Sequence, residues 1–271
     1  MIEIPEAIVI AEQLNKTIKN KQVVSVVAGT SPHKFAFYYD EPERYGDYLC
    51  GHVVKGATAY GGRVEIDVGD ASMHFGDGVN LRYYSEADEK PIKHQLLVNF
   101  EDNSALAGTV AMYGGLWVFP TGAMNDNFYY AAAKNAVSPL SDDFDYKYFI
   151  QSADEKSLKL SAKAFLATKQ RIPGLGNGVL QDVLLKAKVH PKKKMNELSD
   201  LQNLFNSLKS TLMEMVCGGG RDTEKDLFGN CGGYKTKLCK NTSICPNCGS
   251  NVIKENYMGG SIYFCEACQE R

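Results

Sequence analysis

Four cysteines near the C-terminal end of the chain have the residue type and spacing of a metal site. They form two C-x-x-C pairs separated by residues 249–264, and they are Cys245, Cys248, Cys265 and Cys268. Each pair fits a tight turn, so four thiolates can converge on one tetrahedral zinc ion. Four protein ligands leave no open position for water, so we expect the zinc to be structural. A pair of chance C-x-x-C turns or a redox dithiol is the alternative interpretation.

A glycine-rich turn between two predicted helices is the second feature that can contact a ligand. Its sequence, P-G-L-G-N, spans Pro173 to Asn177, and the second helix is expected from about residue 178 to 188. Glycines let the backbone approach a ligand closely, and the N–H groups that open a helix favour an anion. The turn alone is equally compatible with a helix connection that binds nothing.

The elements that must position these features fall into two regions. Residues 5–20 have apolar side chains at helical spacing, and from about 22 to 120 strand-like runs alternate with Gly, Asp and Asn turns. After about residue 125 the pattern becomes helical. We therefore expect an α+β fold, with an N-terminal β-sandwich or barrel behind a leading helix, then a helical region that ends in the zinc hairpin.

Charge and composition restrict the function only weakly. The chain of 271 residues has 30 basic and 32 acidic side chains, which argues mildly against a nucleic-acid binder. Basic residues nevertheless gather at 186–194 and 235–240, and a local basic face can bind phosphates. No apolar run is long enough to cross a bilayer and no signal peptide is evident, so we expect a cytoplasmic protein with free thiols outside the zinc pattern.

The order and spacing of these motifs resemble the formamidopyrimidine-DNA glycosylase and endonuclease VIII family of DNA repair enzymes. The chain opens M-I-E-I-P-E where the family has M-P-E-L-P-E, and the turn Pro173–Asn177 matches the family's helix–two-turn–helix. Residues 245–269 match its C-terminal zinc finger, so the resemblance covers the whole chain. Residues 219–234 are similar to endonuclease VIII-like members, which slightly favours oxidised pyrimidines as substrates.

The resemblance implies three regions and a DNA partner. They are a catalytic β-sandwich at residues 1–130, a helix–two-turn–helix DNA-binding domain at 131–240 and a four-cysteine zinc finger at 241–271. Damaged double-stranded DNA is expected to lie in the cleft between the two larger regions. A monomer that associates with the nucleoid is also implied.

The resemblance further implies a DNA glycosylase with AP-lyase activity. In the family, the N-terminal α-amine attacks C1′ of the damaged nucleotide, a Schiff base forms, and elimination cuts the strand while a carboxylic acid protonates the sugar oxygen. Glu3 occupies the position of this acid, and Glu6 matches the second family glutamate. Residues expected to contact DNA are Arg63, Tyr113, Asn177, Arg221, Lys235, Lys237 and Lys240.

The N-terminus departs from the family pattern. Ile2 stands where the family has proline, and with Met1 retained the nitrogen of Ile2 lies in a peptide bond. Met1 then offers its own primary amine, displaced by one residue, which is our expected nucleophile.

The expected DNA contacts depart from the pattern as well. Arg63 replaces a lysine that contacts phosphate, Gly260 replaces an arginine of the finger, and of the wedge positions only Tyr113 keeps an aromatic side chain. Asp77, at another wedge position, would repel DNA. A DNA-binding relative without glycosylase activity is therefore the alternative function.

Overall fold

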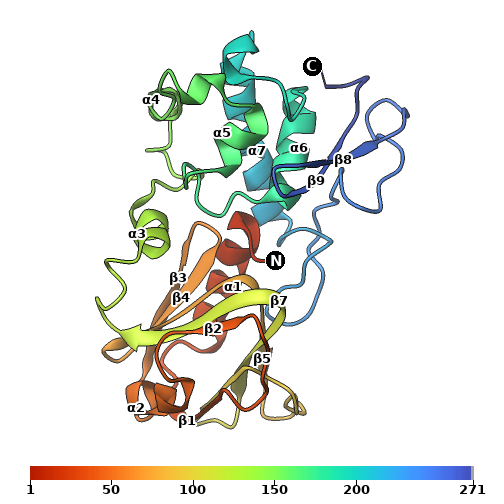
Figure 1. Ribbon diagram of the computed structural model, residues 1–271. Coiled ribbons are helices and arrows are strands. Elements are labelled where there is room, and N and C mark those ends of the chain that lie inside the picture. The colour runs from red at the N-terminus through yellow and green to blue at the C-terminus, as the bar shows by residue number, and fades with distance from the viewer. Residues whose placement is uncertain (270–271) are drawn as a thin grey trace.

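A seven-stranded sheet occupies the N-terminal part of the computed structural model, which describes residues 1–269 (Figure 1). Its strand order is β1-β6-β7-β5-β4-β3, with β2 paired parallel to β7 and every other pair antiparallel. The strands are β1 (Val23–Ala28), β2 (Ala36–Tyr38), β3 (Val54–Tyr60), β4 (Arg63–Val68), β5 (Ala71–Tyr84), β6 (Leu96–Phe100) and β7 (Ala105–Pro120). The predicted N-terminal β region is thus confirmed, and the parallel β2–β7 pair is a feature that the sequence pattern did not indicate.

Helices and a small hairpin make up the other half of the molecule, with the N-terminus between the two halves (Figure 1). The helices of the whole molecule are α1 (Ile4–Thr17), α2 (Tyr45–Leu49), α3 (Phe128–Asn135), α4 (Tyr146–Gln151), α5 (Ala162–Ala167), α6 (Asn177–Ala187) and α7 (Leu201–Cys217), with 3-10 turns η1 (Pro42–Arg44), η2 (Ser157–Lys159) and η3 (Met195–Glu197). Of these, α2 and η1 pack against the sheet in the N-terminal half. The hairpin consists of β8 (Ile253–Tyr257) and β9 (Gly260–Phe264). The α+β fold class is confirmed, while the region boundaries at residues 130 and 240 stay predictions.

Helix α1 joins the two hydrophobic cores. Pro5 lies in its first turn, where proline is tolerated because its missing N–H needs no partner. Ile4 is buried in the core of the C-terminal helices, whereas Ile10 and Leu14 are buried against the sheet. The start of the chain is therefore fixed where the two halves meet. None of the helices within residues 1–269 is long and apolar enough to span a membrane.

Two glycine turns bring the halves into backbone contact beside α1. Gly174, in the turn before α6, has φ +81°, and a side-chain carbon there would lie 1.8 Å from the backbone nitrogen of Gly62 in the β3–β4 turn. The carbonyl of Gly174 accepts a hydrogen bond from the Ile4 N–H at 3.2 Å. Only glycine satisfies both the positive φ and the close approach, so this turn is set by packing between the halves.

A buried polar cluster attaches α3 to the sheet. Lys134 of α3 donates hydrogen bonds of 2.8 Å to both Glu65 of β4 and Tyr130. His74 of β5 lies opposite Glu65 with Nδ1 3.5 Å from its carboxylate, and its ring stacks on Trp117. Burial alone would raise the pKa of Glu65, but its polar contacts with His74, Lys134 and Tyr130 outweigh burial and lower it to about 2.

We predict that Glu65→Gln destabilises the protein in a pH-dependent way. Because the folded-state pKa of Glu65 is lowered from 4.5 to about 2, its stabilising contribution is complete above about pH 4.5 and is lost as the pH falls toward 2. The variant should lose up to about 3 kcal/mol at pH 7, and the difference from the parent protein should shrink at low pH. Urea unfolding across pH 3–7 measures this, with Glu12→Gln on exposed α1 surface as the control. A loss that does not change with pH would contradict the role of the charge.

Candidate active site

The carboxylate of Glu3 lies at the N-terminal end of helix α6. It accepts N–H hydrogen bonds from Gly176, Gly178 and Val179 at 3.1, 3.0 and 2.9 Å. These donors are among the N–H groups that open a helix and favour negative charge. The glycine-rich turn therefore does bind an acidic group, and that group is a side chain from the start of the same chain.

Arg221 joins Glu3 to Glu6 in a buried cluster. Its Nε and Nη2 atoms donate to the two oxygens of Glu6 at 2.9 and 2.7 Å, and Nη1 lies 3.3 Å from Glu3 Oε1. The Arg221 side chain is only 3% exposed. Its guanidinium is engaged with two carboxylates inside the protein, so contact with a DNA phosphate would require it to leave them.

Burial controls the protonation of Glu3. It raises the pKa of Glu3 above 4.5, against the opposing charge of Arg221, while the nearby Glu6 raises it further. Burial would lower the pKa of Arg221, but the charges of Glu3 and Glu6 outweigh it and raise that pKa. Glu3 is thus a carboxyl group that keeps its proton at higher pH than an exposed glutamate, beside a permanently charged arginine.

The amine of Met1 lies near this cluster. It forms an ion pair with Glu224, which is distant in sequence. The backbone nitrogen of Ile2 instead donates a 2.8 Å hydrogen bond to the Asp77 carbonyl, and the Ile2 side chain is buried. Within this arrangement the primary amine belongs to Met1, and Ile2 anchors the segment to β5.

One cavity of about 600 Å³ between the halves brings six of the expected catalytic and DNA-contact residues together. It is lined by Met1 and Glu3, by Tyr113 of β7, by the start of α6 and by the segment before the cysteine hairpin. The expected site residues on its wall are Met1, Glu3, Tyr113, Asn177, Arg221 and Lys240. Residues from both ends of the chain thus face one space that is large enough for a ligand of nucleotide size.

Two cavity residues were missed by the sequence reasoning. Lys163 of α5 is buried, donates a 2.8 Å hydrogen bond to the Tyr257 carbonyl, and has its pKa lowered by burial. The other is Glu224, the partner of the Met1 amine. In the sequence, Lys163 is a charged residue among apolar neighbours in a short helical segment, and this could have indicated a buried lysine. The sequence around Glu224 has no feature that indicates a contact with the N-terminus.

Three of the expected DNA contacts lie outside the cavity. Arg63 lines a smaller cavity of about 140 Å³ behind the N-terminal segment, 3.9 Å from Asp77 and with its guanidinium over the Trp117 ring. Lys235 is exposed with its amine 3.6 Å from Asp222, and the backbone of Lys237 donates to Asp182. The structure therefore places four of the expected DNA contacts on the wall of the large cavity and leaves Arg63, Lys235 and Lys237 outside it.

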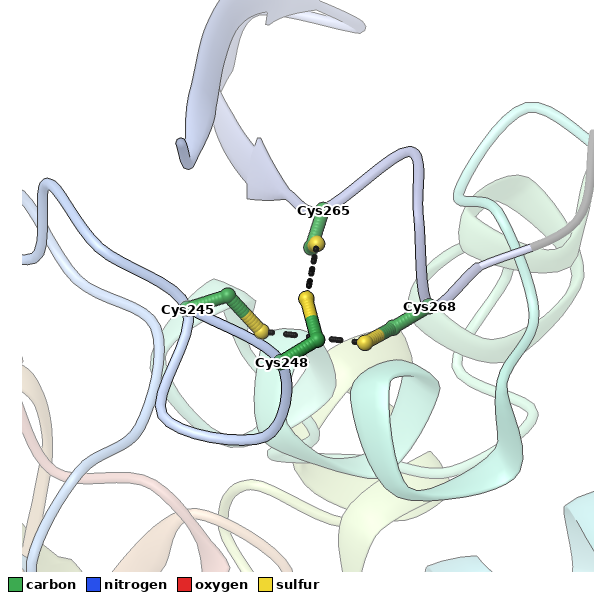
Figure 2. Close-up of side chains that lie close together, drawn as sticks. All are labelled: Cys245, Cys248, Cys265 and Cys268. Carbon is green, nitrogen blue, oxygen red and sulfur yellow. Dashed lines mark hydrogen bonds between the residues drawn. The ribbon is translucent and has the colours of Figure 1, made fainter. Parts of the chain in front are cut away.

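The four cysteines of the C-terminal hairpin converge as their spacing predicts. Their sulfur atoms all lie within 4.8 Å of one another, with 3.5 Å between Cys248 and Cys265 and 3.8 Å between Cys245 and Cys268 (Figure 2). Four sulfurs around a zinc ion at about 2.3 Å are spaced about 3.8 Å apart, so the cluster fits this metal. The arrangement provides four soft ligands without a carboxylate or an open face.

The metal cluster is attached to helix α6. Leu185 of α6 packs on Cys245 and Cys265, and Gln269 links the Cys265 N–H to the Val189 carbonyl through bonds of 2.9 Å each. Gln181 accepts a hydrogen bond from the Tyr263 N–H of β9. Metal binding would thus hold the hairpin in place at the cavity, since Gly260 and Tyr263 of β9 line it.

Comparisons with known sequences point to one kind of enzyme. No protein-family profile matches the chain. A formamidopyrimidine-DNA glycosylase of Lactococcus lactis subsp. cremoris is 25% identical over 283 residues, covering 100% of both chains. A protein of the same name from Wolbachia sp. subsp. Drosophila simulans is 28% identical over 285 residues, covering 99% of this chain and 100% of the relative.

Solved structures resemble the fold over almost the whole chain. A complex between the Lactococcus lactis Fpg and an abasic site containing DNA matches with a TM-score of 0.83 at 23% identity, covering 99% of this chain and 100% of that one. A complex of the Lactococcus lactis Fpg protein with a THF-DNA and an inhibitor matches with a TM-score of 0.82 at 25% identity and the same coverage.

We predict that Cys248→Ser removes a bound zinc ion and weakens DNA binding. A structural zinc needs all four thiolates, and without it the hairpin loses its attachment beside the cavity. Metal analysis of the purified protein should give one zinc per chain, and fluorescence anisotropy with labelled DNA should report the loss of affinity. Cys217→Ser, an exposed thiol outside the cluster, should change neither measurement. Full zinc content in the Cys248 variant would contradict the assignment.

We predict that Arg221→Gln costs about 3–5 kcal/mol of unfolding free energy, because Glu3 and Glu6 would remain buried without their cation. Arg221→Lys should lose less, since lysine keeps the charge but not the two-pronged contact. Lys235→Gln, whose side chain is 85% exposed, is the matched control and should change stability by less than about 0.5 kcal/mol. If Arg221→Gln keeps its stability and loses only salt-sensitive DNA binding, the arginine contacts phosphate instead.

Proposed function

Since the chain belongs to the formamidopyrimidine-DNA glycosylase family, we propose that it removes damaged bases from DNA and then cuts the strand by AP-lyase chemistry. The relatives named above carry the glycosylase activity in their names, and the Lactococcus lactis Fpg binds DNA that contains an abasic site. The observation that carries the proposal is the shared cavity of the Met1 amine and the buried Glu3 carboxyl.

The Met1 amine is the proposed nucleophile. Its nitrogen attacks C1′ of the damaged nucleotide, the base departs, and the resulting Schiff base allows β-elimination of the 3′ phosphate. An amine attacks only after it has lost a proton. Glu224, hydrogen-bonded to the ammonium group, is placed to accept that proton.

Glu3 is the proposed acid that protonates the sugar ring oxygen. A useful general acid must be protonated near the working pH, and burial raises the pKa of Glu3 in that direction. The N–H groups at the start of α6 then stabilise the carboxylate that remains after proton transfer. Arg221 and Glu6 are proposed as positioning residues, because Arg221 contacts Glu3 directly and Glu6 holds Arg221 in place.

The proposed DNA contacts fall into one group inside the cavity and another outside it. Asn177, Tyr113 and Lys240 line the cavity and would contact the damaged nucleotide and its neighbours. Lys235 and Lys237, outside it, would contact phosphates farther along the duplex. Arg63, paired with Asp77, would support the wall of the site, and the proposed metal of the cysteine cluster is a structural zinc.

A second candidate is a DNA-binding relative without glycosylase activity. The observation in its favour is the position of Ile2, whose nitrogen lies in a peptide bond and donates to the Asp77 carbonyl. Such a protein would keep the cavity and bind DNA as a monomer in the cytoplasm without forming a covalent intermediate.

We predict that borohydride traps the protein on duplex DNA through the Met1 nitrogen, and that Glu3→Gln abolishes strand cutting while DNA binding persists. The amide cannot donate the proton, although it fills the same space. Trapping should be tested on duplexes with an abasic site, an oxidised pyrimidine and an oxidised purine, followed by peptide mapping. Glu12→Gln, an exposed glutamate of the same helix, should cut normally.

The outcome separates the two candidates. A circular-dichroism melting curve must first show that Glu3→Gln is folded. Tight binding by the parent protein with no trapped adduct on any duplex would support the second candidate and contradict the lyase. The best-trapped duplex would identify the lesion class.

A further inference from the structure

Two exposed phenylalanines lie at the start of strand β2. Phe35 is in the turn directly before the strand, and Phe37 is in the strand, where its side chain points to the opposite side from those of Ala36 and Tyr38. They are 46% and 50% exposed, whereas Ala36 and Tyr38 between and after them pack on the core of the sheet. Exposed aromatic rings offer a flat apolar surface that a ligand can cover.

The turn that carries Phe35 is attached to β7 next to a residue of the cavity wall. The Phe35 carbonyl accepts a hydrogen bond from the Gly114 N–H at 3.0 Å, and Ala36 pairs with Gly114, so Phe35 and Tyr113 directly precede this pair on the two segments. Tyr113 is 40% exposed and lines the cavity that contains Met1 and Glu3. Strands β2 and β7 run side by side in Figure 1. Phe37, Phe35 and Tyr113, which we call the aromatic strip, therefore lead from β2 to the cavity.

The aromatic strip also carries positive charge. The Lys34 amine lies 5.3 Å from the centre of the Phe35 ring, and the His33 ring meets the same phenylalanine edge-on at 6.5 Å. Exposed aromatic faces together with a cation suit unpaired nucleotides, because every base has a face that stacks and every phosphate is negative. A purely apolar partner would gain nothing from the lysine.

We propose that the aromatic strip stacks on unpaired bases next to the damaged nucleotide, so that the enzyme favours lesions in locally unpaired DNA. The proposal rests on the function proposed above. When a nucleotide leaves the duplex to enter the cavity, the bases around it lose stacking and pairing partners. Phe35 and Phe37 supply a replacement surface outside the cavity, and DNA that is already unpaired reaches this surface without the energy of opening base pairs.

The test compares Phe35→Ala/Phe37→Ala with Phe128→Ala/Tyr129→Ala, an exposed aromatic pair on α3 that lies outside the strip. Binding is measured by fluorescence anisotropy on an abasic-site analogue in a full duplex and in an unpaired bubble of the same sequence. Since stacking contributes about 1–3 kcal/mol per base, the strip variant should bind the bubble at least about tenfold more weakly, with a smaller loss on the duplex. The α3 variant should match the parent protein.

A spectroscopic readout and a rescue variant complete the test. 2-Aminopurine beside the lesion should be quenched by the parent protein through stacking and should stay bright with the strip variant. A variant with Phe35→Trp in place of Phe35→Ala should recover both binding and quenching relative to the strip variant, because tryptophan keeps an aromatic face. Melting curves must show that all variants are folded.

Three results would overturn the proposal. Equal bubble affinity and quenching in the parent protein and the strip variant would overturn this inference alone, while borohydride trapping could still support the proposed function. The same holds for an equal loss on bubble and duplex. If the parent protein binds neither DNA, the proposed function fails together with the inference.

Discussion

The burial of the Glu3 carboxylate is the constraint on which the site depends. A carboxylate in a protein interior is unfavourable unless hydrogen bonds and an opposite charge compensate it. The compensation comes from the first N–H groups of α6 and from Arg221, which lie in the other half of the molecule. The start of the chain can therefore be buried only when both halves are docked, and docking simultaneously forms the cavity.

Helix α6 contacts Glu3 and also the other parts of the site. Its N-terminus binds Glu3, while Asp182 in its middle accepts N–H bonds from Lys237 and Leu238 at 2.9 and 2.8 Å. Gln181 and Leu185 contact the hairpin that carries the four cysteines. A single helix of eleven residues thus positions the proposed acid, the basic segment and the metal hairpin relative to one another.

The sequence predicted those features that depend on local spacing, and it missed those that depend on contacts between distant residues. The C-x-x-C pairs and the start of α6 follow from turn and cap chemistry within a few residues, and the structure has them where expected. The engagement of Arg221 with two glutamates, the pairing of Met1 with Glu224 and the burial of Lys163 join residues far apart in sequence. No periodic pattern encodes such contacts, and a basic residue beside a glycine turn is equally typical of a phosphate contact and of an internal ion pair.

The separation of Glu3 and Arg221 by 218 positions also concerns the timing of synthesis. At about 5–20 residues per second, a ribosome needs about 10–40 seconds after making Glu3 before it makes Arg221. Throughout that interval the two glutamates lack their arginine partner, although the N–H groups of α6 that bind Glu3 are already made. A polypeptide that stops before residue 221 therefore lacks the cation that compensates the two buried carboxyl groups.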